Sequence, residues 1–243
     1  YNYMFLNIFK FEIKYWFKNL SFYIYSITFL LLSVMTIAGL SGVFGEDSIP
    51  AGSFSNSPMS LYSLFNFFNK LSLFLLPAII GSSVYKDYIS NVQNVLYSYP
   101  FTKRDYFLGK FLSSFLIVCL VSSMIGIGFI IGTHLPGMNN AAVLPFEPGV
   151  YLKIYSLYIL PNLIFSGVIV FAVTIFTRNI YAGFITVLVL LIVRESLFKI
   201  AAGATGISGL FALSDPFGEA ATYYYTLKNA NINQNTSDIP FGE

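Results

Sequence analysis

The sequence predicts an all-α membrane protein whose helices cross a bilayer several times. The first observation is composition, because 56% of the 243 residues are hydrophobic and 10% are charged, whereas a soluble domain carries about 25% charged residues. The second is the mean hydropathy of +0.71. The third is that apolar runs recur along the chain, each near the length of about 20 residues that spans a hydrocarbon core.

Net charge and cysteine content argue against a nucleic acid partner and against a disulfide-stabilised domain. The net charge of +2 is too small to indicate a nucleic acid partner. A single cysteine, Cys119, excludes an internal disulfide framework, and its position in an apolar run predicts a small core residue. The first apolar segment is too long for a cleaved signal peptide and lacks a small-residue cleavage pattern, so we interpret it as a retained span.

The first 19 residues predict an amphipathic helix in the membrane interface. Three lysines recur at helical spacing on one narrow stripe, and apolar side chains cover most of the remaining surface. Lysines that reach the headgroups and aromatic rings at the interface are typical of such a helix. The expected anchors of residues 1–19 are Lys10, Lys14, Trp16 and Lys18. The alternative is that this segment extends the first span into the cytoplasm.

Five apolar segments are predicted to cross the membrane, at about 20–42, 61–85, 106–132, 151–177 and 180–193. The segment 196–213 is also apolar, but it is short and interrupted by glycines, so we predict a re-entrant or interfacial element there. Together these segments form a membrane domain over residues 20–213. Glycines at 126, 128 and 132 are expected to allow close helix packing.

The tail over residues 214–243 is predicted to be an extracytoplasmic helix followed by a polar loop. Asp215 is a candidate N-cap and Pro216 takes the first helical position, so a helix is expected to run to about Lys228. Five spans with a cytoplasmic N-terminus leave this tail outside. We therefore expect a sixth span beyond Glu243.

One polar segment separates the second and third spans. Residues 86–99 place apolar side chains at i, i+3, i+4 and i+7 spacing, which predicts a short amphipathic helix. Pro100 ends this helix, because proline lacks the amide donor and restricts the preceding residue. Thr102 and Asp105 form a capping box directly before the next apolar run. A short surface helix, a sharp stop and a capped return to the membrane are suited to contact with a soluble partner.

The distribution of lysine and arginine predicts the orientation of the chain. With a cytoplasmic N-terminus, seven basic residues fall in cytoplasmic segments: Lys10, Lys14, Lys18, Lys86, Lys103, Arg104 and Arg178. The opposite segments hold Lys199 and Lys228. Because positive charge favours the cytoplasmic side, the N-terminus and the polar segment after the second span are both expected there.

The sequence contains no pattern typical of catalysis or metal binding. His134 is the only histidine, so the zinc motif His-Glu-x-x-His is absent. There is also no Gly-x-Ser-x-Gly motif and no pair of intramembrane aspartates. An intramembrane enzyme is therefore disfavoured, and no metal ligand or catalytic residue is predicted.

Residues 96–110 carry a resemblance to a known family. They read LYSYPFTKRDYFLGK, which is similar to the entry to the third span of type-2 ABC transporter permeases, Leu-x-Ser-x-Pro-x-Ser/Thr-Arg-x-x-x-x-Gly-Lys. Lys103 or Arg104 takes the basic position. An N-terminal interfacial elbow helix, six spans and a cytoplasmic coupling helix between spans two and three are typical of this family, and the whole chain resembles that order.

Three further segments resemble one subgroup, in which the permease is fused to a zinc aminopeptidase-like domain. They are Asn56-Ser57-Pro58, Tyr85-Lys86-Asp87 and Asp215-Pro216-Phe217-Gly218. The chain departs from many relatives upstream of the matching segment, where they have Glu followed by Gly-Thr and this chain has Lys86-Asp87 and Ser90-Asn91. This departure falls on the expected coupling surface, so the resemblance does not fix the polarity of that surface.

The resemblance implies a permease subunit of the bacterial inner membrane that pairs with a second permease subunit, identical or different. A cytosolic ABC ATPase subunit would bind ATP and Mg, since this chain has no phosphate-binding loop and no cofactor of its own. The expected contacts with that ATPase are Lys86, Asp87, Tyr88, Ile89, Val92, Val95, Leu96, Lys103 and Arg104. The alternative is that this face packs on the membrane or on the elbow helix.

Polar residues and prolines within the spans are candidates for a translocation path: Lys70, Pro77, Pro161, Asn162, Arg194 and Glu195. Each has a structural alternative. Lys70 is placed to extend its ammonium to the outer interface, and the prolines are placed to kink their helices. Arg194 and Glu195 point about 100° apart on a helix, so we do not expect them to pair with each other.

Export is the expected activity, and an aromatic-rich interior favours hydrophobic cargo among lipids, peptides, drugs and polysaccharides. One alternative of a different class is a membrane anchor or scaffold that transports nothing and holds a larger complex or a fused extracytoplasmic domain. Copurification with an ATPase would distinguish the transporter from the scaffold.

Overall fold

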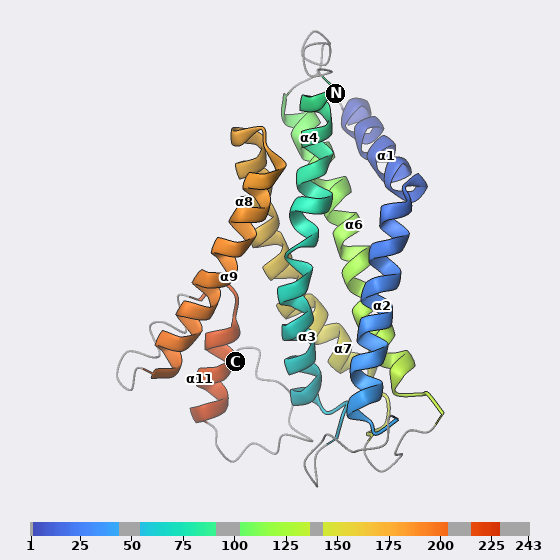
Figure 1. Cartoon of the computed structure of the whole chain (residues 1–243), viewed down its shortest axis with the longest axis vertical. Coiled ribbons are helices and arrows are strands. Elements are labelled where there is room, and N and C mark those ends of the chain that lie inside the picture. The colour runs from blue at the N-terminus through green and yellow to red at the C-terminus, as the bar shows by residue number, and fades with distance from the viewer. Residues whose placement is uncertain (1, 44–53, 91–102, 137–142, 204–214, 229–243) are drawn as a thin grey trace. The chain divides into compact units, whose positions relative to one another are not determined.

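The computed structural model describes residues 2–43, 54–90, 103–136, 143–203 and 215–228, and every regular element in these ranges is a helix (Figure 1). The elements in chain order are α1 (Asn2–Lys18), α2 (Leu20–Leu40), α3 (Pro58–Ser72), the π-helical η1 (Leu76–Gly81), α4 (Ser82–Ile89), α6 (Lys103–Gly132), α7 (Pro148–Ile154), the π-helical η3 (Tyr155–Ile159), α8 (Leu160–Thr177), α9 (Ile180–Gly203) and α11 (Glu219–Lys228). The all-α prediction is confirmed for this part of the chain.

Five helical stretches among the described residues are long and apolar enough to cross a membrane: Leu20–Leu40, Pro58–Ile89, Lys103–Gly132, Pro148–Thr177 and Ile180–Ile200. They coincide with the five predicted spans, and four of them are longer than predicted. The chain is therefore a multi-pass helical membrane protein. The interfacial position of α1 and the presence of a sixth span stay predictions.

Two π-helical segments lie beside the prolines of the second and fourth spans. Pro77 is buried within η1, and Pro161 follows the end of η3 by two residues. Proline removes a backbone donor and clashes with the carbonyl four residues earlier, and a local π turn accommodates such an interruption of the helical ladder. The second and fourth spans therefore change helix type near their prolines.

The fifth span is longer than predicted, and its expected end near Val193 is wrong. α9 continues to Gly203, so Arg194 and Glu195 lie inside the helix. The extension contains arginine, glutamate, leucine, lysine and alanine, which all favour helix. The predicted re-entrant element is therefore helical over 196–203, and its remainder, 204–213, lies outside the described residues.

The start of the predicted coupling helix also differs from the prediction. Residues 86–89 form the last turn of α4, which continues directly from η1, so no separate helix begins at Lys86. The backbone N–H of Ser90 donates to the Lys86 carbonyl, which continues the helical pattern of hydrogen bonds. Residues 91–102, with Val92, Val95 and Leu96, lie outside the described residues.

Contacts between residues divide the chain into two compact units. Unit 1 consists of Tyr1–Ser26, Leu71–Ser122 and Leu163–Leu190, and unit 2 consists of Ile27–Lys70, Ser123–Asn162 and Leu191–Glu243. Each unit has its own buried apolar side chains. They include Leu76, Ile79, Ile80 and Ile117 in unit 1 and Leu61, Phe65, Phe68 and Phe129 in unit 2.

Close packing of α2 against α6 in unit 2 depends on two glycines (Figure 1). A Cβ atom at Gly128 would lie 1.9 Å from the Ser33 hydroxyl oxygen, and one at Gly132 would lie 2.1 Å from Ile37 Cγ2. Glycines four residues apart let helix backbones approach closely in a membrane. The prediction of close helix packing is confirmed at these two positions.

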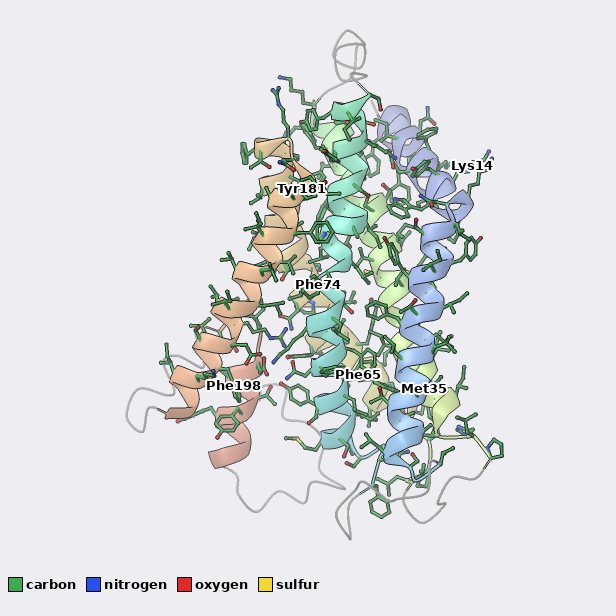
Figure 2. The ribbon with its side chains drawn as sticks, viewed as in Figure 1. Lys14, Met35, Phe65, Phe74, Tyr181 and Phe198 are labelled. Carbon is green, nitrogen blue, oxygen red and sulfur yellow. The ribbon has the colours of Figure 1, made fainter. Side chains whose placement is uncertain are left out.

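Aromatic rings fill the interior of unit 2, while one face of α2 carries exposed apolar side chains. The Phe65 ring centroid lies 5.0 Å from that of Phe129 and 6.3 Å from that of Tyr151. On α2, whose side chains are drawn in Figure 2, Met35 is 61% exposed. Such an apolar face suits contact with lipid tails.

α11 begins later than predicted. Asp215 accepts hydrogen bonds from the backbone N–H groups of Phe217, at 2.9 Å, and Ala220, at 2.7 Å. It therefore caps the turn over residues 215–218, and the helix itself starts at Glu219. α11 packs on the C-terminal part of α9, where the Phe198 and Tyr223 ring centroids are 5.1 Å apart (Figures 1 and 2).

Candidate functional site

The first polar cluster, here called the Arg194 cluster, lies in unit 2. It consists of Asn66 and Lys70 of α3, Tyr158 of η3, Arg194 and Glu195 of α9, and Glu219 of α11. Arg194 is 1% exposed, and its Nε donates to Glu219 Oε2 at 2.7 Å. Its Nη2 donates to Asn66 Oδ1 and to the Tyr158 hydroxyl. The guanidinium therefore contacts three other helical elements.

The Glu219 carboxylate receives donors from three directions. Besides Arg194, its Oε1 accepts from Asn66 Nδ2 at 2.8 Å and from Lys70 Nζ at 3.1 Å. Lys70 also donates to Glu195. The four charged groups, two cations and two carboxylates, balance each other, and this balance is what a charged cluster within membrane-spanning helices requires.

The pKa of Glu219 is lowered from its ordinary value of 4.5. Burial alone would raise it, because the charged form loses solvation. The Arg194 charge, the hydrogen bonds from Asn66 and Arg194, and the Lys70 charge together exceed that effect. The carboxylate is therefore held ionised at neutral pH.

Two rings and one amide complete the surroundings of Arg194. The guanidinium carbon lies 5.4 Å from the Phe217 ring centroid and 5.9 Å from that of Tyr158. Asn162 Nδ2 donates to the Phe217 carbonyl at 3.0 Å. The turn before α11 is thus held to α8 while Glu219 is held to α3 and α9.

Some buried polar atoms beside these residues have no hydrogen-bond partner among the described residues. They are Nη1 of Arg194, Oδ1 of Asn162, and both amide atoms of Asn69, whose side chain is completely buried on α3. A buried donor without an acceptor costs about 1–3 kcal/mol. Unit 2 therefore has unused hydrogen-bonding capacity among its buried polar side chains.

The second polar cluster, here called the Glu12 cluster, lies in unit 1. Glu12 of α1 is 1% exposed. One of its oxygens lies 2.8 Å from Lys86 Nζ, and the other lies 3.1 Å from Lys110 Nζ. Lys110 also pairs with Asp87 and donates to the Ser83 carbonyl at 2.6 Å. The cluster joins α1, the end of α4 and the start of α6.

Two neighbouring residues show how closely these helices approach. The Tyr106 hydroxyl donates to Asp87, so a second residue of α6 contacts the end of α4. A Cβ atom at Gly109 would lie 3.1 Å from Ile8 Cγ2 of α1. Gly109 and Lys110 are the Gly-Lys pair of the matching segment 96–110. Here the glycine admits α1 and the lysine reaches Glu12.

The predicted interfacial anchors do not share one environment. Lys10, Lys14 and Lys18 are exposed, and Lys14 points away from the other helices of unit 1 (Figure 2). Trp16 is only 3% exposed, so its ring packs within unit 1, and its role as an interfacial anchor stays a prediction. Trp16 falls on the same helix face as Glu12, four residues earlier, and that face packs into unit 1.

The predicted ATPase contacts are separated into two groups. Lys86 and Asp87 belong to the Glu12 cluster and pair within the chain. Ile89 is 63% exposed, and Lys103 and Arg104 are exposed at the start of α6. Tyr88 is partly exposed, and its ring centroid lies 5.6 Å from the Arg178 guanidinium carbon.

The candidates for the translocation path also separate. Lys70, Arg194 and Glu195 meet in the Arg194 cluster, and Asn162 supports the adjoining turn. Arg194 and Glu195 pair with different partners, as expected from their directions on the helix. Pro77 belongs to unit 1 and Pro161 is exposed. Neither proline contributes to the cluster.

The sequence did not single out Glu12, Asn66, Tyr158 or Glu219. Glu12 is the only acidic residue among the first 19 and lies opposite the lysine stripe, so it marks the buried face of α1. Asn66 and Lys70 are one turn apart on α3. Glu219 carried no local signal, because its partners lie 25 to 153 positions away in the sequence and only the fold brings them together.

Unit 2 also contains a cavity of about 290 Å³. It is lined by Asn56, Pro58, Leu61, Leu144, Pro145, Glu147, Val150 and Tyr151. The Asn56 side chain and the Leu144 backbone exchange two hydrogen bonds of 2.7 Å, which shape one wall. None of the residues that the sequence predicted as a site lines this cavity.

Comparison with known proteins leaves the family undetermined. No family model, no curated protein and no solved structure matches this chain. The fold and the two clusters define a multi-pass helical membrane protein with paired charges inside each unit, and its function is inferred from those residues.

Proposed function

We propose that this chain is the membrane-spanning permease subunit of an ATP-driven transporter of the type-2 ABC class. A separate cytosolic ATPase subunit would hydrolyse ATP, and a second permease subunit, identical or different, would complete the pathway. The N-terminus would face the cytoplasm of a bacterial inner membrane, and export is the proposed direction. Sequence resemblance over residues 96–110 and the presence of five helices able to span a membrane support this proposal.

The observation that carries the proposal furthest is the Glu12 cluster. Residues 91–102 connect α4 to α6, and the two helix ends that flank them are held to each other through Asp87 and Lys110. Glu12 holds both ends to α1. A segment that receives force from a soluble motor needs such a fixed base, since a loosely attached segment would move alone.

The division of the predicted contacts refines the proposal. Lys86 and Asp87 act in this fixed base, whereas Ile89, Lys103 and Arg104 are the exposed groups beside the connecting segment. We propose that Ile89 and the apolar residues Val92, Val95 and Leu96 dock on the ATPase. Lys103 and Arg104 add positive charge at the edge of that contact.

The decisive experiment is to purify the full chain from its own membranes in a mild detergent and identify the soluble proteins that remain bound. An ATPase subunit with a phosphate-binding loop is expected. Leu96→Asp is expected to abolish its copurification, because a carboxylate would replace an apolar contact. Phe146→Asp is the matched control, since Phe146 is 47% exposed on the predicted opposite side, and it should leave the ATPase bound.

Three outcomes would contradict the proposal. If Leu96→Asp retained the ATPase, the segment around Leu96 would not be the docking segment. Purification without any ATPase would favour a scaffold that transports nothing. The third concerns orientation. In a Cys119→Ala background, Ser90→Cys should be protected from an impermeant maleimide applied to intact spheroplasts, and labelling from outside would reverse the predicted topology.

A further inference from the structure

We propose that Arg194, Lys70 and Asn66 form a binding site for a phosphate group, and that Glu219 of α11 occupies this site in the structure described here. The site would take the anionic headgroup of an amphiphile or free phosphate. Binding itself does not depend on the proposed transport function. The further conclusion that a phosphate-bearing amphiphile is the cargo does rest on it.

The donor set is that of an anion site. A guanidinium, an ammonium and an amide converge on one carboxylate, with contacts of 2.7, 3.1 and 2.8 Å. Arginine and lysine donors bind carboxylate and phosphate by the same charge-assisted hydrogen bonds. The group that fills the site comes from α11, whereas the donors come from α3 and α9 of the membrane-spanning helices.

The carboxylate does not use all the donors that the site offers. Nη1 of Arg194 is buried and has no acceptor among the described residues. A carboxylate has two oxygens and both are already engaged, one by Arg194 Nε and the other by Asn66 and Lys70. A phosphate group brings at least one more oxygen. It therefore offers this set of donors one more acceptor than Glu219 does.

The site is closed on the arginine side and open on the lysine side. The side chain of Arg194 is 1% exposed, whereas those of Lys70 and Glu195 are 27% and 46% exposed. An entering anion would first meet Lys70 and then displace Glu219 from Arg194. Because an isolated buried arginine is strongly disfavoured in a membrane-spanning helix, a replacement anion favours release of the ionised Glu219. Binding of the anion and release of α11 are therefore coupled.

The experiment measures binding of dodecyl phosphate to the full chain in maltoside micelles by ³¹P NMR titration. Glu219→Gln is expected to bind it at least about tenfold more tightly than the unchanged chain, because the internal competitor loses its charge. Glu195→Gln is the matched control. It removes the same charge near Lys70 but leaves Glu219 on Arg194, so its affinity should change less than about threefold. The double variant Arg194→Gln with Glu219→Gln should lose this gain in affinity for dodecyl phosphate.

Two further arms identify the ligand and its source. Dodecyltrimethylammonium should not compete, and competition by it would show that the phosphate merely partitions with its chain, which overturns the proposal. Inorganic phosphate that competes at equal concentration would assign the site to free phosphate, whereas weaker competition would assign it to an amphiphile's headgroup. Equal affinity of the Glu219→Gln and Glu195→Gln variants would also overturn the proposal.

A second measurement applies if Glu219→Gln does not fold. Tyr223 contacts Phe198 at the junction of α11 and α9, so a cysteine there reports release of α11. In a Cys119→Ala, Tyr223→Cys chain, dodecyl phosphate should raise the rate of maleimide labelling at least about threefold. Dodecyltrimethylammonium at the same concentration should not. Failure of the phosphate to raise the rate would contradict the displacement of Glu219, whatever partner ATPase is found.

Discussion

Glu12 of α1 and Lys110 of α6 form an ion pair of 3.1 Å in which the two side chains are 2% and 4% exposed. Few charged side chains are buried this completely, and those that are depend on their partners. Lys86 and Asp87 of α4 supply the remaining charges. The Glu12 cluster therefore connects three helices of unit 1, α1, α4 and α6.

Replacing Glu12 with glutamine should destabilise the protein by about 3–5 kcal/mol, because two lysines lose their common carboxylate and one of them is buried. The free energy of unfolding in mixed micelles, measured by titration with sodium dodecyl sulfate, tests this. Lys14→Gln is the control on the same helix, and its effect should stay within about 0.5 kcal/mol because Lys14 is exposed.

The double variant Glu12→Gln with Lys110→Met distinguishes the net contribution of the ion pair to stability from the cost of removing one partner alone. Replacing both charges with groups of similar size should cost less than the two single changes added together, because each single change removes the same buried contact between Glu12 and Lys110. A double variant that is less stable than the sum of the two single changes would contradict this account of the cluster.

Gly128→Ala should destabilise unit 2 by about 1–3 kcal/mol, because the added methyl group overlaps Ser33 and the Leu30 carbonyl. Gly126→Ala is the matched control two residues earlier. Its Cβ would lie 3.5 Å from the nearest Phe65 atom, an ordinary contact, so the change should be nearly neutral or slightly stabilising. Thermal unfolding in detergent compares the two, and equal effects would exclude close packing as the role of Gly128.

Much of the fold was predictable because the bilayer imposes length and composition on each span. The five spanning helices and the glycine packing of α6 follow from such local rules. The expected end of the fifth span near Val193 was wrong, because α9 continues through Arg194 and Glu195. Their charges are compensated within unit 2.

The charge clusters were less predictable than the helices. Lys70, Arg194 and Glu195 were recognised as unusual, but the sequence offered no way to choose their partners. Glu219 lies outside the spans, and its carboxylate joins them only through the turn that Asp215 caps and Asn162 holds. Trp16 was predicted as an interfacial anchor from its residue type, and its burial follows the face of α1 that also carries the buried Glu12.

The contact of α11 with α9 should weaken in acid. The pKa of Glu219 is lower in the folded state than its ordinary value of 4.5, so ionisation stabilises the folded state above pH 4.5. This stabilisation is lost as the pH falls from 4.5 through the lower pKa of the folded state. The reason is that Glu219 takes up its proton at a higher pH in the unfolded state than in the folded state. Hydrogen exchange of residues 219–228 should accelerate over that range, measured against exchange in α2.

Glu219→Gln should remove this pH dependence, since the amide does not titrate. Exchange in α11 of the variant should be faster at neutral pH and should not accelerate further in acid, after correction for intrinsic exchange rates. A variant that keeps the acid transition of the unchanged chain would assign that transition to another carboxylate.

The two lysines that share Glu12 should differ in their importance for stability. Lys110 is 4% exposed and pairs with Glu12 and Asp87, whereas Lys86 is 29% exposed. Lys110→Ala leaves two carboxylates without their buried partner and should cost about 3–5 kcal/mol. Lys86→Ala removes a partly solvated pair and should cost about 1 kcal/mol or less, although its ammonium also lies 3.8 Å from the Tyr15 ring centroid. Unfolding free energies of the two variants test this order, and a larger loss for Lys86→Ala would show that the half-exposed lysine, and not the buried one, holds α1 to the end of α4.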